Sequence, residues 1–127
     1  IGASPEDARE EMRELLDAMH DIPSEKTLIA AAYFHVKFEN IHPFADGNGR
    51  AGRLTMNYFL VINEHPPITI HQEDRKDYYS ALEVWDESQE LTQMVQFLKE
   101  QTVKTWEKQV LRSENVRLKH SAKLSQF

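Results

Sequence analysis

The sequence contains no cysteine, so disulfide bonds and zinc sites built from thiolates are excluded. No apolar run approaches the roughly 18 residues that a membrane-spanning helix needs, and no segment shows the alternation of a strand ladder. A chain of 127 residues can bury a core without a covalent or metal staple. We therefore expect a single cytoplasmic domain over residues 1–127 that has no membrane contact.

Positive charge is scarce over most of the chain. The net charge is −6, of which residues 1–98 carry −10 and residues 99–127 carry +4. An acidic body disfavours binding to nucleic acid, so we expect no nucleic-acid partner. The basic end is interrupted by glutamate and glutamine, which is typical of a solvated helix face.

Apolar residues recur at spacings of three and four, which is the pattern of helices that share one core. Ser4, followed by Pro5 and two acidic residues, is typical of a helix start, and Ser24 is expected to cap the next helix. That next segment is apolar almost all round and therefore predicts a central, buried helix. The expected helices cover about 5–19, 25–39, 48–63, 74–85 and 89–112. The fold class is all-α.

The last of these helices carries a stripe of apolar residues at helical spacing. The residues of this stripe, which we expect to face the core, are Leu91, Met94, Val95, Leu98, Thr102, Trp106 and Val110. The residues after Asn115 are polar, so we expect them to fray.

Segment 42–53 combines several groups that suit phosphate chemistry. Two glycines flank Asn48 where a loop enters a helix, so backbone N–H groups can converge on an anion there. Arg50 and Arg53 lie one turn apart, and their side chains lean back towards the start of that helix, where each guanidinium can bind phosphate oxygens.

Two more residues complete the chemistry of this segment. Asp46 offers a carboxylate that suits Mg²⁺, and His42 is of the residue type that exchanges a proton near neutral pH. Taken singly, these residues have structural alternatives: a tight turn, a helix cap, or a solvated helix face. A Walker A loop and an EF-hand are excluded, because the lysine of the first and the ligand spacing of the second are missing.

The whole segment, from His42-Pro43-Phe44 to Arg53, resembles the Fic-family signature His-Pro-Phe-x-(Asp/Glu)-Gly-Asn-Gly-Arg-x-x-Arg at every fixed position. Similarity continues on both sides, for example in Phe38-Glu39-Asn40-Ile41 and in Tyr78-Tyr79-Ser80-Ala81-Leu82, and covers roughly 5–106. The resemblance implies a compact helical Fic core with a central buried helix pair flanking the active-site loop. Residues 107–127 would form a C-terminal helical extension.

The same resemblance implies an ATP-dependent protein adenylyltransferase, which transfers AMP to a Ser, Thr or Tyr hydroxyl of a target protein and releases pyrophosphate. His42 would be the general base, Asp46 would hold Mg²⁺, and Phe44 would anchor the loop in the core. The nucleotide-binding residues would be Gly47, Asn48, Gly49, Arg50 and Arg53, with Asn48 orienting the α-phosphate.

Other readings stay open at this point. Related sites transfer UMP, phosphate or phosphocholine, and a decayed domain could bind nucleotide without catalysis.

In the family a β-hairpin flap aligns the target, and only residues 1–3 could be its remnant here. The family's inhibitory motif fits neither Glu39 nor Glu114, so we expect the inhibitory element in an N-terminal segment or a separate partner.

Three side chains near the segment are expected to be structural. His35, on the buried helix, is expected to be a hydrogen-bonded core histidine. Of Tyr78 and Tyr79, one is expected to pack in the core and the other to be exposed. The remaining histidines are scattered along the chain and predict no metal cluster.

Overall fold

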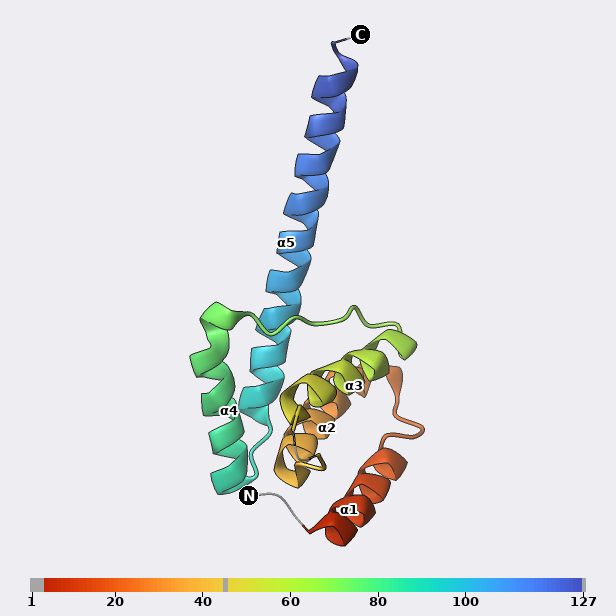
Figure 1. Cartoon of the computed structure of the whole chain (residues 1–127), viewed down its shortest axis with the longest axis vertical. Helices are drawn as coiled ribbons and strands as arrows, with labels where there is room; N and C mark the ends of the chain where they lie inside the picture. Colours follow the sequence, from red (N-terminus) through yellow and green to blue (C-terminus); the bar gives the residue numbers. More distant parts are fainter. Residues whose placement is uncertain (1–3, 45, 127) are drawn as a thin grey trace.

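The computed structural model describes residues 4–44 and 46–126, and these residues form helices without any strand. The expected flap remnant, residues 1–3, lies outside the described part. The all-α prediction is confirmed, and no helix of the described residues is long and apolar enough to cross a membrane. The elements are α1 (Pro5–Ala18), η1 (Ser24–Lys26), α2 (Thr27–Ile41), α3 (Asn48–Ile62), η2 (Gln72–Asp74), α4 (Arg75–Ser88) and α5 (Thr92–Leu124), shown in Figure 1.

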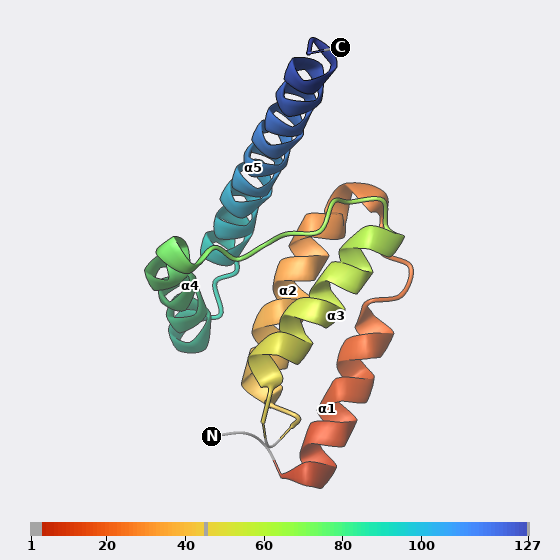
Figure 2. The ribbon, with the colours of Figure 1, turned by 45° about the horizontal axis from the view of Figure 1, so that its top comes forward.

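Helix α2 is the centre of the fold, as its uniformly apolar sequence predicts. It contacts α1, α3, α4 and α5, and α1 and α3 run alongside it (Figure 2). Its fully buried side chains include Ala31, Phe34 and Val36, which join residues of all the other α-helices in one hydrophobic core. The loop that leaves the end of α2 and enters α3 is therefore held between two packed helices.

The start of α1 agrees with the sequence prediction, whereas the start of α2 does not. Ser4 Oγ accepts a hydrogen bond from the Asp7 N–H at 3.3 Å, and Pro5 occupies the first turn. The prediction that Ser24 caps the next helix was wrong, because Ser24 is itself the first residue of η1. A short 3-10 turn thus leads into α2 in place of a capped end.

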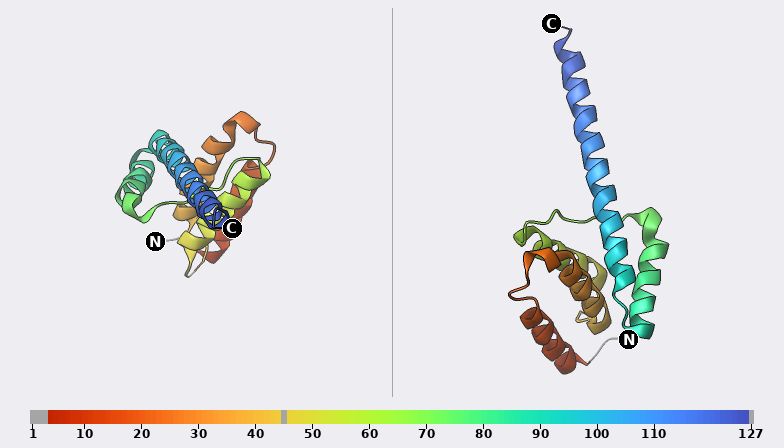
Figure 3. Two further views of the ribbon diagram at one scale, coloured as in Figure 1. Left: turned by 90° about the horizontal axis from the view of Figure 1, so that it is seen from above. Right: turned by 180° about the vertical axis from the view of Figure 1, so that it is seen from behind.

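Helix α5 differs from its prediction in length and in the face that it buries. It continues to Leu124 without fraying at Asn115, and its distal part extends away from the body (Figure 3). Trp106 was predicted to face the core but is 61% exposed, and Val110 is exposed as well. The buried face consists of Met94, Phe97, Leu98, Gln101 and Thr105.

Two polar residues on the buried face of α5 explain why this face differs from the predicted apolar stripe. Gln101 Oε1 accepts a hydrogen bond from the His71 N–H at 2.8 Å, and Thr105 Oγ1 accepts one from the Thr69 N–H at 3.2 Å. These bonds satisfy the extended backbone that runs from α3 to η2, so polar side chains are buried where apolar periodicity alone would not place them.

Candidate active site

His42 lies at the point where α2 ends and the active-site loop begins. Its N–H donates to the Phe38 carbonyl at 3.0 Å, and its backbone is left-handed, with φ 52°. A non-glycine residue in this conformation costs about 1 kcal/mol, so the surrounding packing must hold it there. The imidazole is exposed, and a partner molecule can therefore reach it.

Asn48 closes the loop that His42 opens. Its Oδ1 accepts from the Phe44 N–H at 2.9 Å, and its Nδ2 donates to the Phe44 carbonyl at 2.7 Å. Asn48 is only 5% exposed. A pair of bonds from one buried amide fixes the backbone two residues after His42 and so limits where the imidazole can move.

Phe44 itself does not occupy the core. The prediction that it anchors the loop by burial was wrong, because the residue is 53% exposed. Its ring centroid lies 6.3 Å from that of the buried core residue Phe38. The backbone bonds to Asn48 anchor the loop instead.

The N-terminus of α3 faces the loop without a side-chain cap from any described residue. Gly47 precedes it with φ 76°, a conformation that glycine adopts without strain. The first N–H groups of a helix have no partner within the helix, and they carry the positive end of its dipole. This end of α3 therefore offers an anion a set of free donors.

Both arginines fold back over this helix end, as the sequence predicts. A Cβ atom added at Gly47 would lie 3.5 Å from Arg50 Nη2, and one added at Gly49 would lie 3.2 Å from Arg53 Nη1. The glycines thus leave room for the guanidinium groups beside the backbone donors. Two fixed positive charges and a helix N-terminus converge in one place, a combination that suits a polyphosphate.

Comparison with known proteins agrees with this arrangement. Residues 1–60 match the sequence model of the Fic/DOC family. Over these residues, which are just under half of its length, the chain is similar to that family.

Named relatives and a solved structure are also similar to this chain. It is 43% identical over 75 residues to "Protein adenylyltransferase Fic" of Drosophila persimilis, across 59% of this chain and 15% of the relative. It is 37% identical over 86 residues to "Protein adenylyltransferase fic-1" of Caenorhabditis elegans, across 64% of this chain and 16% of the relative. The structure of Fic-1 from C. elegans superposes with a TM-score of 0.75 at 27% identity, over 90% of this chain and 35% of that one. The chain thus spans only a small part of the curated relatives that it matches.

Asp46 is the carboxylate closest in sequence to the N-terminus of α3. It is exposed, and its Oδ1 accepts from the Gly47 N–H at 2.8 Å. In the described ranges 4–44 and 46–126, no three His, Cys, Asp or Glu side chains are grouped as metal ligands. A lone carboxylate fits a magnesium ion that keeps most of its waters and arrives with a phosphate ligand, so the donor set is compatible with Mg²⁺.

A buried polar layer lies behind the arginines. His35 Nε2 and the Tyr78 hydroxyl are 2.6 Å apart and share a hydrogen bond. Burial, with a smaller influence of Arg53, lowers the pKa of His35 to about 4, so this histidine is neutral near pH 7. The prediction of a hydrogen-bonded core histidine is confirmed. Tyr78 is 6% exposed and Tyr79 57% exposed, which confirms that one tyrosine packs in the core and the other does not.

A polar pocket of about 390 Å³ opens on the Arg53 side of this layer. Its lining residues are Arg53, Ile70, His71, Gln72, Arg75, Tyr78 and Tyr79. Sequence reasoning did not single out His71, Gln72 or Arg75 for this pocket. They lie on the connection to α4 and at its start, so no spacing in the sequence indicates that they are near Arg53.

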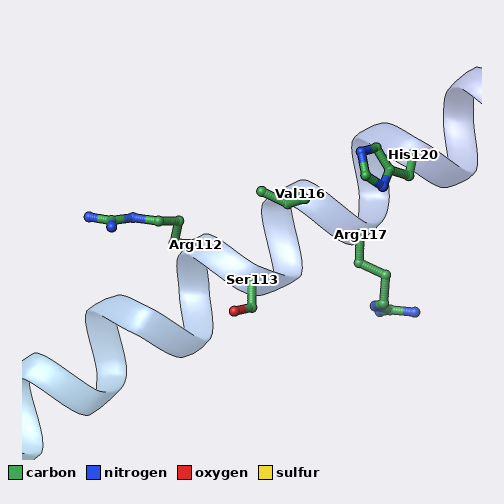
Figure 4. Close-up of a pocket in the computed structure, with 5 residues that line it drawn as sticks. All are labelled: Arg112, Ser113, Val116, Arg117 and His120. Carbon is green, nitrogen blue, oxygen red and sulfur yellow. The ribbon is translucent and has the colours of Figure 1, made fainter.

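A second concave surface, on the distal part of α5, lacks the converging side chains of a ligand site. Arg112, Ser113, Val116, Arg117 and His120 outline a shallow concavity on the distal part of α5. All five come from one helix, and their side chains point outward from it in different directions (Figure 4). With a single helix as its wall, this surface brings no converging groups to a ligand.

Proposed function

We propose that this chain transfers AMP from ATP to a Ser, Thr or Tyr hydroxyl of a target protein and releases pyrophosphate. The observation that carries the proposal is the convergence of two guanidinium groups on the uncapped start of α3, next to an exposed histidine on a clasped loop. The names of the relatives support the same activity. Residues 5–106 would be the catalytic core, and the rest of α5 would be an extension.

In the proposed reaction His42 removes the proton from the target hydroxyl. The hydroxyl oxygen forms a bond to the α-phosphorus while the bond from that phosphorus to the bridging oxygen of the β-phosphate breaks. The electron pair leaves with pyrophosphate, and the proton stays on the His42 imidazole. Such a displacement depends mainly on positioning and on neutralisation of charge.

The other residues would bind and orient the nucleotide. The N–H groups around Gly47, Asn48 and Gly49 would receive phosphate oxygens, and Arg50 and Arg53 would bind the β- and γ-phosphates. Asp46 would hold Mg²⁺, which when bound would neutralise part of the phosphate charge. The Asn48 amide already bonds Phe44, so we propose that it positions the loop and that the backbone here contacts the α-phosphate.

Regulation, target and location are further parts of the proposal. We place the inhibitory element outside these residues, in an N-terminal segment or a separate partner, because neither Glu39 nor Glu114 fits the family motif. The partner would be a protein that presents a flexible hydroxyl-bearing segment. A cytoplasmic location is compatible with the absence of cysteine, and it can be checked by fractionation of cells.

The experiment is incubation of the chain with a cell lysate and with ATP labelled on either the α- or the γ-phosphorus. Transfer of AMP attaches the α label to protein and releases the γ label. Attachment of the γ label alone would indicate phosphate transfer and contradict the proposal. Attachment of neither label, together with tight ATP binding in calorimetry, would indicate a nucleotide-binding module.

A further inference from the structure

The polar pocket beside Arg53 is lined by two arginines from different helices. Arg53 comes from α3 and Arg75 is the first residue of α4, and both line the same cavity of about 390 Å³. Tyr78 and Tyr79 follow Arg75 by three and four residues, so the three side chains share one face of α4. The cavity therefore combines two guanidinium groups with two phenol hydroxyl groups.

The two carboxylates that precede Arg75 in the sequence are bound by α5. Lys104 Nζ lies 2.9 Å from Glu73 Oε1 and 2.7 Å from Asp74 Oδ2. Within the part of the chain that the structure describes, neither Arg53 nor Arg75 has an ion-pair partner. The two guanidinium groups at the pocket therefore keep positive charge that an anionic ligand can neutralise.

His71 lines the same pocket, but its ring nitrogens have partners on α5. Its N–H donates to Gln101 Oε1 at 2.8 Å, its Nε2 lies 3.3 Å from Thr105 Oγ1, and its Nδ1 lies 3.4 Å from Lys108 Nζ. Burial and the positive charge of Lys108 lower the pKa of the imidazole, so it is neutral near pH 7. The positive charge at the pocket therefore comes from the arginines.

The Tyr78 hydroxyl supplies a hydrogen-bond donor at the buried wall of the pocket. It lies 2.6 Å from His35 Nε2, while His35 Nδ1 is buried without a partner among the described residues. A buried N–H without an acceptor is rarer in proteins than an unused lone pair, so the ring proton belongs on Nε2. That N–H donates to the Tyr78 oxygen, which leaves the hydroxyl hydrogen free to donate to a ligand.

Arg53 connects this pocket to the start of α3. Its Nη1 lies 3.2 Å from the position of a Cβ atom added at Gly49, so the same guanidinium group borders both the N-terminus of α3 and the pocket. A chain of phosphates that begins at the backbone donors around Gly49 can therefore continue past Arg53 towards Arg75. The guanidinium groups and the free hydroxyl hydrogen are donors, and phosphate oxygens are acceptors.

We propose that the pocket between Arg53 and Arg75 binds the terminal phosphate of ATP, and that Arg75 is the residue that distinguishes a nucleoside triphosphate from a diphosphate. The inference rests on the proposed function, in which ATP is the nucleotide and Arg53 binds its γ-phosphate. Two guanidinium groups can bind one terminal phosphate because it offers three acceptor oxygens. A diphosphate has no phosphate in the pocket, so the contribution of Arg75 is specific for ATP.

The test measures the affinities of ATP, ADP and AMP by calorimetry for Arg75→Gln and for Lys76→Gln. Both variants remove one positive charge from the first turn of α4, but Lys76 does not line the pocket. Arg75→Gln should bind ATP about tenfold more weakly, as expected for the loss of one charge-assisted contact, while the affinities of ADP and AMP change by less than about twofold. Lys76→Gln should match the wild type with all three nucleotides.

Three results would overturn the inference. Equal weakening of ATP, ADP and AMP binding by Arg75→Gln would mean that Arg75 contacts a part of the nucleotide other than the terminal phosphate. An unchanged ATP affinity would mean that it makes no contact, and an equal loss in Lys76→Gln would show an effect of overall charge. Arg75→Lys keeps the charge and should recover part of the lost ATP affinity, whereas no recovery would also count against a phosphate contact.

Transfer of the α label tests the proposed function separately from this inference. If the wild type transfers AMP and Arg75→Gln keeps the wild-type preference for ATP over ADP, only the inference is wrong. If the wild type transfers no label but Arg75→Gln still loses that preference, the inference holds for nucleotide binding and the proposed transfer reaction is wrong.

Discussion

The body of the molecule and the distal part of α5 are both helical but are stabilised differently. In the body, α2 contacts four other helices, and polar side chains such as Gln101 are buried against specific backbone partners. From Gln109 to Gln126 every residue is exposed, and the polar contacts there are local, such as Glu114 with Arg117. Helix formation alone therefore does not mark the functional unit, which is defined by tertiary contacts.

The largest effect should come from overfilling the α2–α3 contact in the body. In Gly52→Val the new Cβ would lie 3.0 Å from Phe38 Cδ1 and 3.2 Å from Glu39 Oε1, in a fully packed region. Overpacking should lower the free energy of unfolding by about 2 kcal/mol or more. Urea denaturation measures it.

Gly49→Ala is the matched control for that change. Its Cβ would meet only the movable end of Arg53, at 3.2 Å, so stability should change by less than about 1 kcal/mol. Equal destabilisation by the two variants would show that the α2–α3 contact is looser than described.

A smaller but more local effect should follow from Asn48→Ala. The change removes both hydrogen bonds to the Phe44 backbone, each worth about 1 kcal/mol, and frees the segment that follows His42. The rate of transfer should fall about tenfold while ATP affinity changes less. Amide hydrogen exchange at Phe44 should accelerate.

The result that would contradict this loop-closing role is a loss of ATP affinity with unchanged exchange at Phe44. That outcome would indicate that the Asn48 side chain contacts the α-phosphate directly.

The smallest effect should come from deleting residues 109–127. All described residues of that stretch are exposed, and the last ion pair between α5 and the body, Lys108 with Glu73 at 3.0 Å, stays in place. The midpoint of thermal unfolding should shift by about 2 °C or less, and ATP affinity should be unchanged. A large loss of either would mean that the distal helix belongs to the functional unit.

The sequence predicts the body better than it predicts the details of contact. The apolar pattern of α2 and the capping signal at Ser4 are local, so they can be recognised without a structure. The burial of Gln101 and the exposure of Phe44 depend on partners distant in the chain or on the backbone of the loop.

The same distinction holds within the candidate site. The chemical groups on His42, Arg50 and Arg53 are evident from the motif, and their fold-back over α3 follows from helix geometry. The strained backbone of His42 and the enclosed carboxylate of Glu39 arise only when α3 packs across the end of α2. Neither leaves a periodic or compositional signal in the sequence.

The most direct test of the central claim compares two exposed histidines, His42 at the loop and His120 on the distal helix. With α-labelled ATP and a lysate as acceptor, His42→Ala should lose transfer by about a hundredfold or more while calorimetry still shows ATP binding. His120→Ala should equal the wild type. Substantial transfer by His42→Ala, or an equal loss in His120→Ala, would contradict the assignment of catalysis to the loop between α2 and α3.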